Sequence, residues 1–283
     1  MITTRFAPSP TGRLHLGHAL SAVFGHQQAH RGGAKGKFLV RIEDLDQGRA
    51  RAEFVDGIFE DLDWLGLVPA QPPLIQSQRT AAYADALDAL RGQGLVYACF
   101  CTRADIAAAL AAPQGAAAAH YPGTCRHLPD DPARRSAEAH SWRLDVERAL
   151  ARTGLPIWRE GARTFAAARA DLDDIILARK DAPAAYHLAC VVADAASGIS
   201  LVTRGADLRS STPVQRLLQL LLDLPQPDYL HHRLVAHADG RRLAKRDQAP
   251  TLAAMRAAGT DGRELAYRLK AGELPLGFAF LED

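Results

Sequence analysis

The sequence has few cysteines, few lysines and no long apolar stretch. Its 283 residues carry a formal net charge of only +2, so any contact with a nucleic acid must come from a local patch rather than from a field over the whole surface. No apolar run approaches the ~20 residues of a membrane-spanning helix. The start, MITTRFAPSP, lacks the basic and apolar regions of a secretory signal. We therefore expect a cytoplasmic protein that makes no membrane contact.

The composition is typical of a folded globular protein. Apolar residues make up 48% of the chain and charged residues 23%, which excludes a disordered, collagen-like or coiled-coil protein. A chain of this length predicts about two domains. Its 34 cationic residues include only five lysines, so each lysine is of particular interest.

Apolar strands and helices alternate along the first hundred residues. Short strands are predicted at 2–6, 36–42 and 96–100, and helices at 16–30, 51–65 and 81–92. This alternation predicts an α/β protein with a parallel sheet. Later in the chain, strands are predicted at 175–177, 199–202 and 229–236, and helices at 212–221, 251–258 and 262–271.

The segment between these two regions is less regular. It includes an Ala-rich stretch at 107–119, which we interpret as helix and loop without chemistry. We interpret the whole segment as an insertion that splits one nucleotide-binding domain. The expected parts are the first half of that domain (1–98), the insertion (99–170), the second half (171–237), and a basic loop with a helical C-terminal segment (238–283).

The first motif that carries chemistry is RFAPSPTGRLHLGHA, residues 5–19. A strand ends, a Pro/Gly turn follows, and His-Leu-Gly-His opens a helix whose N-terminus supplies N–H groups and a positive dipole end for a phosphate. Gly17 lets a ligand approach the backbone closely. His15 and His18 can donate hydrogen bonds to phosphoryl oxygens as negative charge develops there. Considered alone, the pattern favours two surface histidines that cap a helix.

The second motif is the loop GRRLAKRD, residues 240–247. Four cations within six residues form a flexible cationic clamp. An ammonium such as that of Lys245 can follow a moving phosphate as a point charge. A solvated basic loop is the alternative when this segment is considered alone.

Three of the four cysteines, Cys99, Cys101 and Cys125, lie in one short region. In a chain expected in a reducing compartment, this crowding favours a metal over disulfides. Two thiolates two residues apart can bind one Zn²⁺, a third can come from a later loop, and a tetrahedral site needs a fourth ligand. His127 is the chemically simple choice for that ligand. The alternative is three reduced structural cysteines without metal.

Together, the two phosphate motifs resemble a known family. HLGH near the start and RLAKR after the last strand are similar, in order, to the HIGH and KMSKS signatures of class I aminoacyl-tRNA synthetases. The segments VRIEDLD, QSQRTAAYADAL, VYACFCT and VTRGADLRSSTPVQ resemble the glutamyl-type members over nearly the whole chain. Full synthetases of this type carry further helical domains that read the anticodon. Because this chain stops soon after the KMSKS-like loop, it resembles a truncated branch of the family.

The resemblance implies a fold and a reaction. The fold would be a Rossmann-like class I catalytic domain with a zinc-bearing insertion and a short helical C-terminal segment. The enzyme, a ligase, would use ATP, with Mg²⁺, to activate L-glutamate. It would transfer the glutamyl group to queuosine, a modified base in the anticodon loop of tRNA(Asp), and a monomer is expected.

Three other functions are alternatives to this one. One is a minimal glutamyl-tRNA synthetase that charges the 3′ end of tRNA(Glu). Another is a non-catalytic module that binds tRNA or an amino acid, and the presence of both phosphate motifs argues against it. The third is a small-molecule nucleotidyltransferase, which the RIED and TRGAD segments disfavour.

The resemblance also implies site residues. For glutamate it implies Arg5, Ala7, Ser9, Glu43, Tyr186 and Arg204. For ATP it implies His15, Gly17, His18 and Lys245, of which His15, His18 and Lys245 would be catalytic. The charges suit glutamate, because each arginine can fork onto a carboxylate and Glu43 can pair with the ammonium. In the truncated branch, the pattern YxGxC implies that Tyr121 rather than His127 completes the zinc site with Cys99, Cys101 and Cys125.

Three positions depart from the family's pattern. Arg242 replaces the first lysine of KMSKS and Ala244 replaces its serine, whereas Lys245 keeps the second lysine and is therefore assigned the main phosphate role. Cys190 stands where the family tends to have asparagine. Because it lies within an apolar run, we interpret it as a buried inert thiol.

Overall fold

The computed structural model describes residues 1–110, 121–179, 182, 184–241, 243 and 250–281. The helices within these residues are α1 (Leu16–His30), α2 (Ala52–Trp64), α3 (Thr80–Gly92), α4 (Arg103–Leu110), α5 (Pro132–Ala137), α6 (Val146–Thr153), α7 (Tyr186–Ala196), α8 (Thr212–Leu221), α9 (Leu252–Ala257) and α10 (Gly262–Lys270). The strands are β1 (Thr3–Phe6), β2 (Lys37–Ile42), β3 (Leu74–Ile75), β4 (Val96–Cys99), β5 (Ser141–Leu144), β6 (Ile157–Glu160), β7 (Arg163–Ala166), β8 (Ile176–Ala178), β9 (Leu201–Gly205), β10 (Asp228–His232), β11 (Val235–His237) and β12 (Phe278–Phe280).

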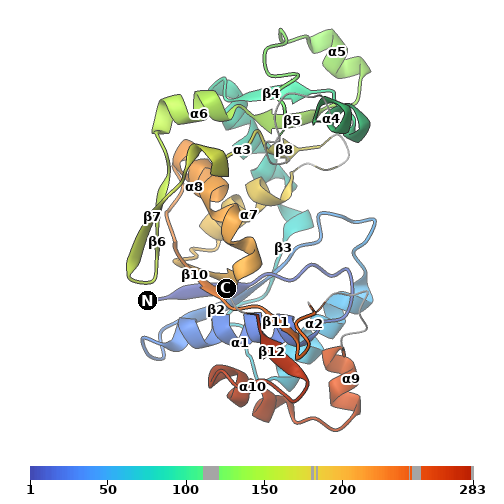
Figure 1. The fold of residues 1–283 in the computed structure, drawn as a ribbon, viewed down its shortest axis with the longest axis vertical. Coiled ribbons are helices and arrows are strands. Elements are labelled where there is room, and N and C mark those ends of the chain that lie inside the picture. Colours follow the sequence, from blue (N-terminus) through green and yellow to red (C-terminus); the bar gives the residue numbers. More distant parts are fainter. Residues whose placement is uncertain (111–120, 180–181, 183, 242, 244–249, 282–283) are drawn as a thin grey trace.

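Two groups of parallel strands form the centre of the molecule. β1 pairs with β2 and β2 with β3, while β10 pairs with both β9 and β6, all in parallel. The backbone N–H of Ser200, just before β9, donates to the carbonyl of Thr3 in β1 at 3.0 Å, which joins the two groups. α1 connects β1 to β2 and α8 connects β9 to β10, so the chain runs outward from this junction in both directions (Figure 1). Ligands of α/β proteins bind at such a switch point.

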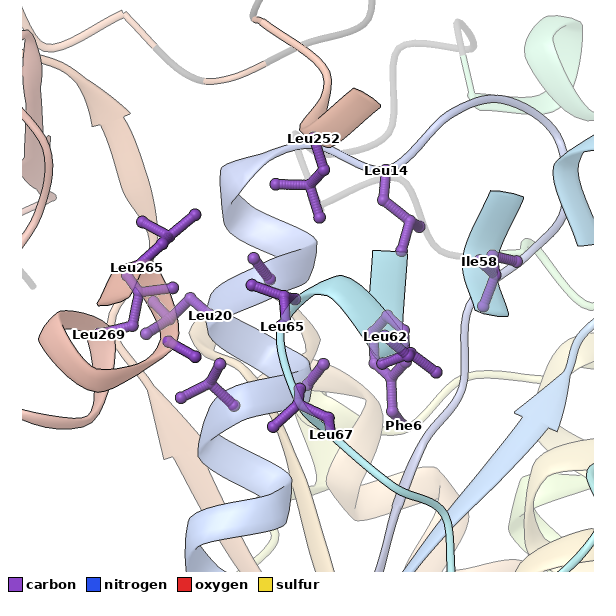
Figure 2. Close-up of a cluster of buried hydrophobic side chains, with 14 of the residues drawn as sticks. Phe6, Leu14, Leu20, Ile58, Leu62, Leu65, Leu67, Leu252, Leu265 and Leu269 are labelled. Atoms are coloured by element: carbon purple, nitrogen blue, oxygen red, sulfur yellow. The ribbon is translucent and has the colours of Figure 1, made fainter. Parts of the chain in front are cut away.

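One apolar core lies where α1 and α2 pack with the C-terminal helices. Figure 2 shows Leu20 of α1 beside Leu265 and Leu269 of α10, and Leu62 of α2 beside Phe6 of β1. Burying one such side chain contributes roughly 1.5–3 kcal/mol to the free energy of folding. The contacts in this core pack the C-terminal helices directly on the half of the protein that contains β1 and α1.

A second part of the molecule is an antiparallel sheet at the end opposite α9 and α10 (Figure 1). Its strand order is β4, β5, β8. β4 pairs antiparallel with β5, which pairs antiparallel with β8. The strands predicted at 96–100 and 175–177 are thus present, but the prediction that the first belongs to the parallel sheet is wrong. The apolar pattern of a short strand does not indicate its pairing partner.

Most helix predictions are confirmed, and those at 16–30 and 212–221 match α1 and α8 to the residue. α7 was not predicted. Its buried residues include four in succession, from Leu188 to Val191, so the polar face that would reveal a helical period is missing. The single strand predicted at 229–236 is two strands, β10 and β11, of which the second pairs with β12. Residues 111–120 of the Ala-rich stretch lie outside the described residues.

Among the described residues, no helix is long and apolar enough to cross a membrane.

The turn between α1 and β2 has no room for a side chain at Gly36. A Cβ there would lie 1.7 Å from the carbonyl oxygen of Ala29, a backbone atom that cannot turn away. At Gly32, in the same turn, a Cβ would meet no atom within 4 Å.

We expect Gly36→Ala to lower the free energy of unfolding by about 1–3 kcal/mol, because the turn must shift to relieve the overlap. Gly32→Ala, the matched control, should change it by less than about 0.5 kcal/mol. Urea unfolding of both variants measures the difference. Equal stabilities would contradict the close approach at Gly36.

Candidate active site

A cavity of about 640 Å³ opens where β1, β2, β9 and β10 end. Its lining includes every predicted glutamate- or ATP-binding residue that the structure describes: Arg5, Ala7, Ser9, His15, Gly17, His18, Glu43, Tyr186 and Arg204. Segments far apart in the sequence therefore meet at one place, as expected at the switch point of a parallel sheet.

Lys245 lies outside the described residues, as do Arg242 and Ala244. Two described residues nearby lie at the cavity or contact one of the residues that line it. Leu243 lines the cavity. Thr251 forms an isolated β-bridge with His15, and the next residue donates its backbone N–H to the Leu14 carbonyl at 2.8 Å.

His15 and His18 cap the first turn of α1. The Nδ1 atom of His15 accepts the N–H of Gly17 at 3.1 Å, and Nδ1 of His18 accepts the N–H of His15 at 3.1 Å. A neutral imidazole that accepts at Nδ1 carries its proton on Nε2. Each ring therefore has an Nε2–H donor, at the helix end where the dipole favours an anion. The capping and the phosphate-binding interpretations are compatible with each other.

Four charged side chains form a network beside the cavity, and all of them except the half-buried Glu43 are buried. Arg5 Nε donates to Asp194 Oδ1 at 2.9 Å, Arg41 also pairs with Asp194, and Arg41 Nη2 donates to Glu43 Oε1 at 2.8 Å. Burial alone would raise the pKa of Asp194, but the Arg41 and Arg5 guanidinium groups outweigh it and hold that pKa below its usual range. The carboxylate therefore stays charged between two cations.

Arg5 is already engaged within the protein. Besides its two contacts to Asp194, its Nη1 donates to the Thr203 carbonyl at 3.0 Å. A guanidinium has five N–H groups, so at most two remain for a substrate carboxylate. Arg5 is thus fixed by its neighbours before any ligand binds.

Sequence reasoning missed Arg41 and Asp194. Arg41 is the one arginine of the apolar strand KFLVRI, and Asp194 is the one charged residue of α7. A charged side chain with apolar residues on both sides is the signal that was available, because such a charge needs a partner when it is buried. The signal does not indicate which partner, and Asp194 and Arg5 are 189 residues apart.

The guanidinium group of Arg204 makes three side-chain hydrogen bonds within the protein. Its Nη1 donates to Gln215 Oε1 and its Nη2 to Thr212 Oγ1, each at 2.7 Å, while its Nε donates to His231 Nε2 at 3.1 Å. Tyr186, the first residue of α7, lines the same cavity and is 37% exposed, which leaves part of its ring accessible.

Cys190 is buried, as expected from its apolar surroundings. Its Sγ lies 3.4 Å from Arg41 Nη2 and 3.7 Å from Asp194 Oδ2. Burial raises the pKa of this thiol. It therefore packs against the charged network as a neutral group.

Cys99, Cys101 and Cys125 form a cluster that could hold a metal ion, with their sulfur atoms within 4.8 Å of one another. The phenol oxygen of Tyr121 lies among them, 3.2 Å from the sulfur of Cys99 and 3.4 Å from that of Cys101. The Cys125 backbone N–H also donates to this oxygen, at 3.1 Å. His127, by contrast, is exposed and is not part of the cluster. The described residues thus bring Tyr121, rather than His127, to the three sulfurs.

Residues 1–267 match the family of class I tRNA synthetases (E and Q), catalytic domain. The chain belongs to this family of aminoacyl-tRNA ligases, and the expected α/β, Rossmann-like class I fold is confirmed.

Several relatives of this chain carry the same function in their names. A glutamyl-Q tRNA(Asp) synthetase of Rhodobacter capsulatus is 41% identical over 93% of this chain and 97% of its own length. One from Nocardia farcinica is 44% identical over 90% of this chain and 79% of its own. The family resemblance predicted from the motifs is therefore confirmed.

A solved structure also has this fold. The glutamate-tRNA synthetase of Elizabethkingia anophelis is 26% identical, with a TM-score of 0.73, over 87% of this chain. The chain spans about half of that protein's length, since the match covers 53% of it.

The capping role of His15 can be separated from a role of its Nε2–H donor. Asparagine caps helices well and reproduces Nδ1 but not Nε2. We expect His15→Asn to keep the stability of the protein and His15→Ala to lower it by about 1 kcal/mol. Both variants should lose most of the rate of ATP–pyrophosphate exchange. Full exchange by His15→Asn would leave His15 as a cap alone.

Proposed function

We propose that this protein activates L-glutamate with ATP and transfers the glutamyl group to queuosine in the anticodon loop of tRNA(Asp). The observation that carries the proposal is the single cavity that combines a donor-rich helix N-terminus with an arginine- and glutamate-lined end. The names of the relatives that match nearly the whole chain support the choice of acceptor.

Glutamate fits the charged end of this cavity. It carries two carboxylates and one ammonium, and the cavity offers Arg5, Arg204 and Glu43. We assign a carboxylate to the remaining donors of each arginine and the ammonium to Glu43, with Ala7, Ser9 and Tyr186 as further contacts. Because these arginines are fixed in advance, binding does not require them to be ordered.

In the activation step, a carboxylate oxygen of glutamate attacks the α-phosphorus of ATP. The bond between that phosphorus and the bridging oxygen of pyrophosphate breaks, and glutamyl-adenylate forms. We assign His15, His18 and Lys245 to the negative charge that develops on the phosphates, with Gly17 giving access to the helix N-terminus. Mg²⁺, when bound with ATP, would neutralise further phosphate charge. Catalysis then rests on positioning and electrostatic stabilisation.

In the transfer step, a hydroxyl of the acceptor attacks the carbonyl carbon of the adenylate and AMP leaves. A second cavity, of about 620 Å³, shares Ser9, Glu43 and Tyr186 with the first and is also lined by Arg49 and Arg179. A molecule in this second cavity can approach Glu43 and Tyr186 without passing His15 and His18. We assign this cavity to the approach of the acceptor nucleotide, whose backbone phosphates suit the two arginines.

We also propose that Cys99, Cys101, Tyr121 and Cys125 hold one structural Zn²⁺. Three sulfurs with a phenol oxygen among them supply four donors of the kind and number that a closed tetrahedral site requires. Zn²⁺ would crosslink the loop that contains Tyr121 and Cys125 to the end of β4. The cluster has no residue in common with the cavity at the parallel strands, so we assign it no catalytic role.

Purified protein should contain about one Zn²⁺ per chain. Tyr121→Phe, which removes one oxygen, should release zinc to a chelator faster than the unchanged protein, whereas His127→Ala should behave like the unchanged protein. Elemental analysis and timed dialysis measure both effects. Retention by Tyr121→Phe together with loss by His127→Ala would reverse the assignment.

The two candidate acceptors are queuosine and the 3′-terminal adenosine of the tRNA, and removing one of them shows which is used. Queuosine-containing tRNA(Asp) that has been trimmed of its 3′-terminal adenosine should still accept labelled glutamate, because the loop hydroxyls remain. The same tRNA without queuosine should not. If trimming abolishes transfer, the protein charges the 3′ end and is a minimal glutamyl-tRNA synthetase.

A further inference from the structure

His231 contacts the candidate glutamate site without lining the cavity. It lies on β10, directly opposite Arg204 of β9 in the parallel ladder, and its side chain is fully buried. Its Nε2 atom accepts the Nε–H of Arg204 at 3.1 Å. An imidazole can accept at Nε2 only when that nitrogen is unprotonated, so the contact requires the tautomer with the proton on Nδ1.

The other ring nitrogen faces an acid. Nδ1 of His231 lies 2.9 Å from Oε1 of Glu160 on β6, a side chain that Arg209 also approaches, at 3.5 Å. The two atoms lie at ion-pair distance without the alignment of a hydrogen bond. A carboxylate this close to Nδ1 favours, through its charge, a proton on that nitrogen, and so keeps Nε2 available as an acceptor. Glu160, His231 and Arg204 thus form a chain of contacts across three neighbouring strands.

Burial keeps His231 neutral. It lowers the pKa of His231, the positive charges of Arg204 and Arg209 act in the same direction, and Glu160 opposes them. A protonated ring would place a second cation against the Arg204 guanidinium. The neutral ring therefore suits the acceptor role that the geometry requires.

The contact with His231 completes the fixation of Arg204. Thr212 and Gln215 each take one N–H from the two terminal nitrogens, and His231 takes the N–H of Nε. Of the five N–H groups of a guanidinium, this leaves one on each terminal nitrogen. Without His231, the guanidinium would be held only at its far end and could rotate about its last bonds.

We propose that His231 is a positioning residue, whose neutral Nε2 atom fixes the plane in which Arg204 receives a carboxylate of glutamate. The inference rests on the proposed function, since it presumes that Arg204 binds glutamate. A residue that only supported the fold would affect stability or both substrates alike. A positioning residue affects the KM for glutamate and leaves the KM for ATP and the kcat nearly unchanged.

The test uses two variants of similar polarity. The amide of glutamine falls near Nε2 of a histidine and can still accept from Arg204, whereas the amide of asparagine falls near Nδ1 and cannot reach it. His231→Asn should raise the KM for glutamate about tenfold in ATP–pyrophosphate exchange, as expected for loss of a hydrogen bond to a charged group. His231→Gln should stay within about threefold, and calorimetric titration with glutamate should give the same order.

Arg204→Lys distinguishes the inference from the function on which it rests. If this variant leaves the KM for glutamate unchanged, the assignment of Arg204 to glutamate is wrong. If it raises that KM while His231→Asn and His231→Gln behave alike, only the positioning role is wrong.

A further variant covers the case in which His231→Asn does not fold. Glu160→Gln weakens the contact to Nδ1, so we expect a severalfold rise in the KM for glutamate in the otherwise unchanged protein. In the His231→Gln background, the same change should have no effect on that KM, because the contact through Nδ1 is already absent. An equal effect in both backgrounds would overturn the proposal.

Discussion

The candidate active site depends on the two ion pairs that the buried Asp194 carboxylate forms with Arg5 and Arg41. The carboxylate joins α7 to β1 and β2 where the cavity opens, and through Arg41 it also holds Glu43. Removing one partner of a buried ion pair costs about 3–5 kcal/mol, because the remaining charge loses its compensation. The network therefore stays assembled without a ligand and presents fixed charges to the cavity, the arrangement that electrostatic catalysis requires.

Another part of the cavity lining, His15 to His18, is in contact with a segment from near the other end of the chain. The turn of HLGH supplies the helix N-terminus, and the strand-like contact between His15 and Thr251 returns the chain to that turn after the basic loop. The packing of α10 on α1 makes this return part of the core (Figure 2). The lining of the cavity thus combines fixed charges that suit an amino acid with hydrogen-bond donors that suit a phosphate chain.

Local sequence patterns predicted where helices and strands lie in the chain better than they predicted which elements contact each other. The bounds of α1 and α8 follow from the sequence, whereas α7 is too evenly buried to show a helical period. For the site, motif positions predicted which residues would line the cavity, but not that Asp194 would engage Arg5 or that His231 would hold Arg204. Such roles depend on contacts between strands and helices far apart in the sequence, which neither periodicity nor a short motif encodes.

The central claim is that one cavity binds glutamate and ATP together and joins them without help from another molecule. Exchange of labelled pyrophosphate into ATP, measured without tRNA and with glutamate, glutamine or no amino acid, tests it most directly. The arrangement of Arg5, Arg204 and Glu43 predicts exchange that depends on glutamate and is much weaker with glutamine, which lacks the second carboxylate. No exchange with glutamate in the absence of tRNA, or equal exchange with both amino acids, would contradict the claim.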